Sequence, residues 1–136
     1  MRKWNRADGW PDALAQVVEK HSKLPFEYGK SDCGQFAADA VQAVTGHDLF
    51  KDYRNYTTKT GAARVLRKAE CNNLGELFSK YLNETHIAHA MRGDIGVIEY
   101  DGQICAGVFT GVGFACKGEN GLVFVNRDQV KQVFEV

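Results

Sequence analysis

The sequence lacks an excess of charge of either sign. Its 17 basic side chains balance 17 acidic ones among 136 residues, and neither sign forms a long run. Nucleic acids and anionic membrane surfaces are bound through clustered positive charge, so the composition gives no sign of such a partner. We therefore expect no nucleic-acid partner and look for function in individual sites.

Prolines and long apolar runs are also scarce. The chain has 2 prolines, no repeat of fixed period and no low-complexity tract, which predicts one domain over residues 1–136. No stretch is long and apolar enough to be a membrane-spanning segment. The first residues, MRKWNRADGW, lack the apolar core of a signal peptide, so we expect synthesis in the cytoplasm.

Cysteines are few and widely separated. The four of them (Cys33, Cys71, Cys105 and Cys116) match no compact metal motif, and we expect reduced thiols, no metal and no cofactor. One alternative stays open at this stage. If Cys33, Cys105 and Cys116 converged in the fold, they would offer thiolates to a soft metal such as zinc or to an iron–sulfur centre.

Helical periodicity dominates the first part of the chain. Apolar residues recur at helical spacing in four segments, which predicts helices over about 11–22, 33–45, 60–69 and 74–82. Pro11 suits a first helical turn, and Gly46 suits the end of the second helix. The segment 50–59 is expected to be an ordered connection.

After Gly93 the sequence changes to short β-rich runs separated by turn signals. They predict an antiparallel sheet of about five strands, with a short helical turn near residues 127–132. Helices followed by a meander indicate an α+β domain in which the N-terminal helices pack on one face of the C-terminal sheet. Strand alternation puts Cys105, Gly107 and Phe109 on one face of their strand.

Cys33 is the first residue of the predicted second helix. A helix N-terminus favours the thiolate through its unpaired N–H groups and its dipole, although Asp32 would compete for that field as the N-cap. A cysteine nucleophile also needs a base and donors for the oxyanion. The four histidines (His21, His47, His86 and His89) lie outside the predicted strands, so a buried packing role for Cys33 stays open.

Two quoted stretches carry a family resemblance. PFEYGKSDCGQF, followed later by RGDIGVI and a glycine-bearing strand, resembles the NlpC-type branch of papain-like cell-wall peptidases and amidases. More closely, the chain is similar to small phage and prophage tail-module proteins that share the pattern of Tyr56–Arg64. The resemblance implies a papain-like α+β fold.

The resemblance also implies roles for individual positions. Cys33 falls at the nucleophile, Phe26 at a tyrosine of the motif, and Asp94 at the structural acid of the Gly-Asp pair. Cys105 falls at the position of the catalytic histidine, and Cys116, or Lys117 beside it, near the third, orienting residue. The same arrangement implies that Cys105 and Gly107 face the helix of Cys33, with Gly107 permitting close helix–sheet approach. Cys33 and Cys105 would then be neighbours in a small, fairly apolar site. A thiol is a poor substitute for imidazole as a general base, so a base would have to come from elsewhere, with His86 or His89 folded over the cleft as one alternative.

The resemblance therefore implies a protein associated with a phage or prophage tail tip. Its ancestral activity would be hydrolysis of peptidoglycan peptide bonds through Cys33, with a catalytic set that is incomplete at Cys105. The alternative is a catalytically inactive structural component of the tail, and a third hypothesis is a host-interaction protein. Expected partners are tail-tip or hub proteins and peptidoglycan, and the expected location is the virion after synthesis in the host cytoplasm.

Overall fold

Four helices form the first part of the chain. The computed structural model describes residues 1–136 and places the helices at α1 (Trp10–Lys23), α2 (Cys33–Thr45), α3 (Lys59–Lys68) and α4 (Leu74–Tyr81). Side chains cap three of them, because Asp32, Thr58 and Asn73 each accept a backbone N–H of the first turn. Gly46 ends α2 in the left-handed conformation that glycine tolerates. The four predicted helices are confirmed to within a residue or two.

A six-stranded antiparallel sheet forms the second part. Its strands are β1 (Glu84–Thr85), β2 (Ile95–Tyr100), β3 (Gln103–Thr110), β4 (Gly113–Gly118), β5 (Gly121–Val125) and β6 (Val130–Phe134), in the order β1-β6-β2-β3-β4-β5. The two short 3-10 helices are η1 (Ile87–His89) and η2 (Arg127–Gln129). The α+β class is confirmed. The expected number of strands, about five, misses β1, whose two residues pair with β6 and carry no periodicity of their own.

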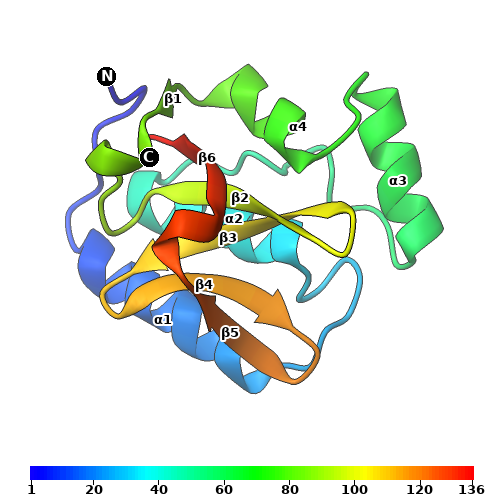
Figure 1. Ribbon diagram of the computed structural model, residues 1–136, viewed down its shortest axis with the longest axis horizontal. Coiled ribbons are helices and arrows are strands. Elements are labelled where there is room, and N and C mark those ends of the chain that lie inside the picture. The colour runs from blue at the N-terminus through cyan, green and yellow to red at the C-terminus, as the bar shows by residue number, and fades with distance from the viewer.

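The main core lies between α2 and the sheet. Figure 1 shows α2 behind β2 and β3, and α1 behind β4 and β5. Most residues of α2 are buried, and its alanines allow the helix to lie close to the small residues of β3. A second apolar cluster fills the opposite face of the sheet, made of Ile98, Phe109, Phe114, Cys116, Val130 and Val133. Both faces of the central strands are therefore covered.

The two faces of β3 correct one expectation. The predicted alternation is present, but Ala106 and Val108 belong to the cluster shared with α2, whereas Phe109 and Cys105 pack with the opposite cluster. Gly107 therefore does not make room for the helix. A Cβ atom at Gly107 would lie 2.5 Å from Cε2 of Phe114, so its missing side chain lets that ring cross the strand.

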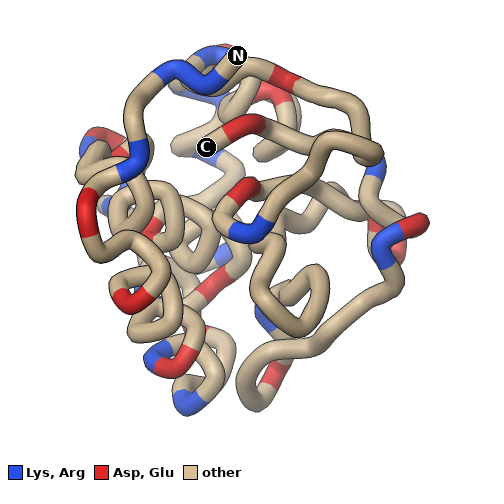
Figure 2. Tube along the Cα trace, turned by 90° about the vertical axis from the view of Figure 1, so that its left-hand side faces the viewer, with Lys and Arg blue, Asp and Glu red and all other residues tan.

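Asp94 joins the two ends of the chain. Its buried carboxylate accepts from Arg2 at 2.6 Å, from Arg6 at 3.2 Å and from the backbone N–H of Val136 at 3.0 Å. Burying a carboxylate is costly unless charge and hydrogen bonds compensate it, and here both do. Elsewhere, Figure 2 shows acidic and basic residues interspersed along the trace, without a continuous stripe of one sign.

Candidate functional site

The first turn of α2 holds Cys33 in a fixed position. Asp32 caps the helix as predicted, with Oδ1 accepting from the N–H of Gln35 at 2.8 Å. Its Oδ2 accepts from the N–H of Gly29 at 2.8 Å and from the hydroxyl of Tyr56 at 2.6 Å. Burial, and then the Asp32 carboxylate, raise the pKa of that Tyr56 phenol. Asp32 thus anchors three segments around the cysteine.

Cys105 of β3 lies against Cys33, although the two residues come from different layers. The backbone N–H of Phe109 donates to Asp94 and its carbonyl accepts from Gly93, so the odd-numbered backbone groups of β3 point toward β2. The even-numbered groups then point toward β4. The register with β4 ends at the pair Gly107–Cys116.

The end of that register leaves one backbone donor for the site. Ala106 lies just beyond the last β3–β4 pair, and its N–H donates to the sulfur of Cys33. The departing end of β4 is held elsewhere, because Glu119 accepts from the N–H of Phe26 at 2.8 Å and Lys117 donates to the carbonyl of His21 at 2.6 Å. The N-terminus of α2 reaches Cys105 at this opening between β3 and β4.

The two thiols interact, and the interaction shifts their pKa values in opposite directions. The thiol of Cys33 donates to Cys105, which lowers the pKa of Cys105 to about 7 against the effect of burial. The same bond, together with burial, raises the pKa of Cys33 well above its usual value, although the N–H of Ala106 acts in the opposite direction. Cys105 is therefore the more acidic thiol of the pair, whereas the helix N-terminus alone predicts that Cys33 is.

Cys116 lies behind Cys105 on the outer face of the sheet. Burial, and then the proximity of Cys105, raise the pKa of Cys116 to about 12. Cys33 is therefore next to Cys105, and Cys116 is a diagonal neighbour of Cys105 across β3 and β4. They do not make a metal centre, because no group of three or more histidine, cysteine or acidic side chains is arranged to hold a metal ion.

Aromatic side chains close the site on the side of the α1–α2 connection. Phe26 is 36% exposed and packs edge-on against Tyr28, with ring centroids 4.9 Å apart. Burial, then the proximity of Cys33, raise the pKa of the Tyr28 phenol, with smaller effects from Asp32 and Cys105. The family resemblance places Phe26 where the motif has a tyrosine, so the tyrosine hydroxyl is missing at that position. The structure instead brings the phenol of Tyr28 close to the thiol pair.

None of the four histidines lines the site. His86 caps η1 and accepts from the N–H of Ala88, and η1, which ends at His89, packs beside β6. His47 stacks on Trp4 with ring centroids 4.3 Å apart. The alternative in which His86 or His89 folds over Cys33 is therefore wrong, because both belong to a segment held at another edge of the sheet.

The fourth histidine forms a buried network that the sequence did not reveal. His21 is fully buried, with Nδ1 2.8 Å from Oγ of Ser31 and Nε2 2.8 Å from Oδ2 of Asp39. Arg54 lies 3.0 Å from the other oxygen of Asp39. Burial would raise the pKa of Asp39, but the bond from His21 and the positive charges of Arg54 and Lys20 outweigh burial and lower it. The network fastens α1 to α2 and to the loop before Cys33.

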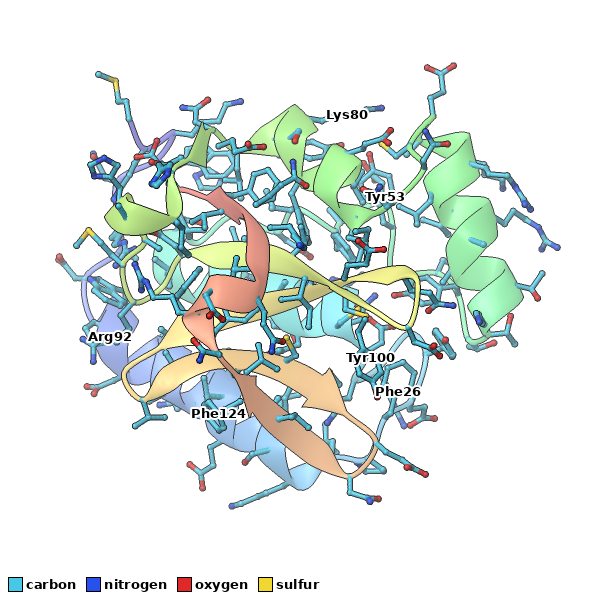
Figure 3. The ribbon with its side chains drawn as sticks, viewed as in Figure 1. Phe26, Tyr53, Lys80, Arg92, Tyr100 and Phe124 are labelled. Carbon is cyan, nitrogen blue, oxygen red and sulfur yellow. The ribbon has the colours of Figure 1, made fainter.

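A groove of about 540 Å³ opens over the thiol pair. Cys33, Cys105 and Tyr28 line it together with the face of α3 that carries Ala62 and Leu66. Phe26 and Tyr53 also line it, and Figure 3 shows both on the side of the molecule where α3 and the β2–β3 turn lie. The groove is largely apolar and aromatic, with amide side chains from the connection between α3 and α4.

Fold and site together define an α+β protein with a thiol pair at the base of an apolar groove. The chain belongs to a family described as a domain of unknown function (DUF6950), whose family model matches residues 5–136. No curated protein matches the sequence. None of its helices has the length and apolar character needed to cross a membrane.

Proposed function

We propose that the protein is an NlpC-like component of a phage or prophage tail tip. In this proposal the groove binds peptide of peptidoglycan, and peptide hydrolysis through Cys33 is lost or very slow. The observation that carries the proposal is the identity of the group beside Cys33, which is the thiol of Cys105 and not an imidazole. The link to tails and cell walls rests on the resemblance of the quoted motifs.

The chemistry of amide hydrolysis explains why this group matters. A nucleophilic cysteine must be ionised, and the leaving nitrogen must later receive a proton, tasks that imidazole performs near neutral pH. Here Cys105 is the more acidic thiol, and the interaction with Cys105 together with burial raises the pKa of Cys33 well above its usual value. The thiol at the nucleophile position is therefore a weak nucleophile at neutral pH.

The groove itself supports a role in binding. It is lined by aromatic rings and by small residues of α3, with Asn72 and Asn73 at its rim as hydrogen-bonding amides. Apolar walls with a few placed polar groups are typical of sites for small ligands and peptides. Such a site suits a short peptide with small side chains, as in peptidoglycan stems.

The segment that carries the closer resemblance also builds this groove. Tyr56 holds the cap of α2 through Asp32, and Thr58 caps α3 by accepting from Gly61 at 3.0 Å. Ala62 and Ala63 follow on the groove side. Proteins that share the pattern Tyr56–Arg64 would therefore share the groove wall, and this supports binding as their common property.

Muropeptide release from purified peptidoglycan tests the catalytic part, with the wild-type protein kept reduced. We expect background release from wild type and from Cys33→Ser, and measurable release from Cys105→His, which restores an imidazole beside the thiol. A matched variant, Cys116→His, should stay at background because Cys116 is buried and does not line the groove. If wild type released muropeptides and Cys33→Ser did not, the proposed loss of hydrolysis would be wrong and the protein would be a cysteine hydrolase.

Sedimentation with purified sacculi tests the binding part. Ala63→Trp fills the groove from an exposed position, whereas Val123→Trp changes an exposed residue of β5 outside it. We expect the first variant to lose binding and the second to keep it. Equal sedimentation of both would remove the groove from the proposal, and absence of the protein from purified tails would remove the tail assignment.

The second candidate is the hydrolase itself. The observation in its favour is the lowered pKa of Cys105, which makes that thiolate a proton acceptor within reach of Cys33 at neutral pH. The release assay described above separates the two candidates.

A further inference from the structure

We propose that Cys33 and Cys105 are a redox pair that closes to a reversible disulfide at the base of the groove. The two thiols belong to segments far apart in the sequence, the first turn of α2 and the first half of β3, and the fold brings both of them to the lining of one groove. The proposal does not depend on peptide binding or hydrolysis.

Access singles out this pair among the four cysteines. All four are free thiols, but Cys71 and Cys116 are buried, with 4% and 6% of their surface exposed, whereas Cys33 and Cys105 are partly exposed and line the groove. A small oxidant entering the groove therefore meets these two sulfurs first. Reactive cysteines are typically accessible and have a lowered pKa, and Cys105 is partly exposed with a pKa lowered to about 7.

Closing the bond requires the sulfurs to approach to about 2.05 Å. The local structure permits this movement. Cys105 lies before the first residue of β3 that pairs with β4, so only β2 restrains it on the sheet. Cys33 is the first residue of its helix, where its own N–H carries no intrahelical bond.

Cys116 is a poorer partner for Cys105. Cys116 pairs with Gly107, so it is diagonal to Cys105 on the same face of the sheet. Diagonal neighbours have Cβ atoms roughly 7 Å apart, whereas a disulfide needs about 4 Å. The geometry therefore directs Cys105 toward Cys33.

The reaction balances with a peroxide as the oxidant. The Cys105 thiolate attacks one oxygen of hydrogen peroxide, the O–O bond breaks, and the released hydroxide takes up a proton, which leaves a sulfenic acid on Cys105. The sulfur of Cys33 then attacks the sulfenic sulfur, the S–O bond breaks, and the Cys33 proton leaves with the hydroxide as water. A small-molecule disulfide gives the same product through a mixed disulfide on Cys105, with two thiols released.

Intact-mass measurement and non-reducing digestion test the proposal with the full chain, treated with hydrogen peroxide and then with dithiothreitol. We expect wild type to lose two hydrogen atoms and to give a linked pair of tryptic peptides, 31–51 and 93–117, that the reductant separates. Cys116→Ala should behave like wild type. Cys33→Ala and Cys105→Ala should give no internal link.

Chemical trapping of the sulfenic acid provides a second test of the proposal. Dimedone should label Cys105 in Cys33→Ala, where no resolving thiol remains, and should label wild type far less. Oxidation of Cys105 at pH 7 should be about fivefold slower in Cys33→Ala, because the gain in thiolate from the Cys33 bond exceeds the loss of nucleophilicity that accompanies a lower pKa. Wild type that accumulates labelled Cys105 without a link, or that links Cys105 to Cys116 or to a second chain, would overturn the proposal.

Discussion

Two polar clusters occupy the same helix and differ in nearly every property that chemistry requires. Near the middle of α2, Asp39 binds an oriented imidazole, His21, whose other nitrogen contacts a serine hydroxyl. At the start of α2, Cys33 faces another thiol and a groove. The first cluster has the groups of a catalytic triad without access, and the second has access without an imidazole.

The difference shows that residue type and mutual distance do not define an active site. His21 and Ser31 are 0% and 1% exposed, and neither lines the groove, so no substrate can reach them. Their hydrogen bonds satisfy buried polar groups that would otherwise destabilise the fold. Substitutions in the two clusters should therefore have opposite consequences for stability and for thiol chemistry.

The largest effect on stability is expected from His21→Ala. The change leaves a cavity in the core and removes one of the partners of the half-buried Asp39, so we expect a loss of about 3 kcal/mol in the free energy of unfolding. Urea unfolding measures the loss. His47→Ala is the matched control, because that ring stacks on Trp4 without a buried ion pair, and it should cost about 1 kcal/mol or less. A small effect of His21→Ala would contradict its structural role.

Helix positions could be predicted from the sequence because their signals are local. Asp32 and Gly46 mark the ends of α2, and both act as those residue types suggest. The faces of β3 could not be assigned, because strand alternation gives two sets of residues without saying which set meets the helices. Only the packing of Phe114 across Gly107 settles that question.

The site could be predicted only in part, because sequence patterns report local structure and not contacts between distant residues. The contact between Cys33 and Cys105 followed from a family resemblance, because the two residues are distant in sequence. The interaction between their thiols, which lowers the pKa of Cys105, depends on side-chain geometry that periodicity does not encode. Tyr28 was missed for that reason as well, and so was the buried ring of His21, whose position on an apolar helix edge was its only signal.

Gly107→Ala tests the corrected faces of β3. The added methyl group would lie 2.5 Å from Phe114 and 2.6 Å from the carbonyl of Ala115, so we expect a loss of about 2 kcal/mol in the free energy of unfolding. Gly111→Ala is the control, because its nearest neighbour would be Arg92 at an ordinary 3.7 Å. If Gly107→Ala proved neutral, the account of the Phe114 crossing would be wrong.

Acid should protonate Cys105, whose pKa is about 7, well before it weakens the cluster around Asp39. The pKa of Asp39 is lowered in the folded state, so the contribution of this carboxylate to stability is present above its unfolded pKa of about 3.9 and is lost as the pH falls through the lower folded value. The difference in unfolding free energy between wild type and Asp39→Asn should be constant from about pH 7 to pH 5 and shrink below it. A difference that grows on acidification would reverse the assigned sign.

The smallest effect on stability is expected from Cys33→Ala, where the effect on chemistry is large. The side chain is partly exposed beside the groove, and we expect a cost of about 1 kcal/mol or less. Removing the thiol that donates to Cys105 should raise the pKa of Cys105 from about 7 toward the ordinary range of a cysteine, near 9. The pH dependence of iodoacetamide alkylation, followed by mass spectrometry of peptide 93–117, measures that change. His21→Ala is the control, and as long as this variant stays folded it should have the same midpoint of alkylation as wild type. An unchanged midpoint in Cys33→Ala would mean that something other than Cys33 lowers the pKa of Cys105. The proposed chemical difference between the two clusters of α2 would then be wrong.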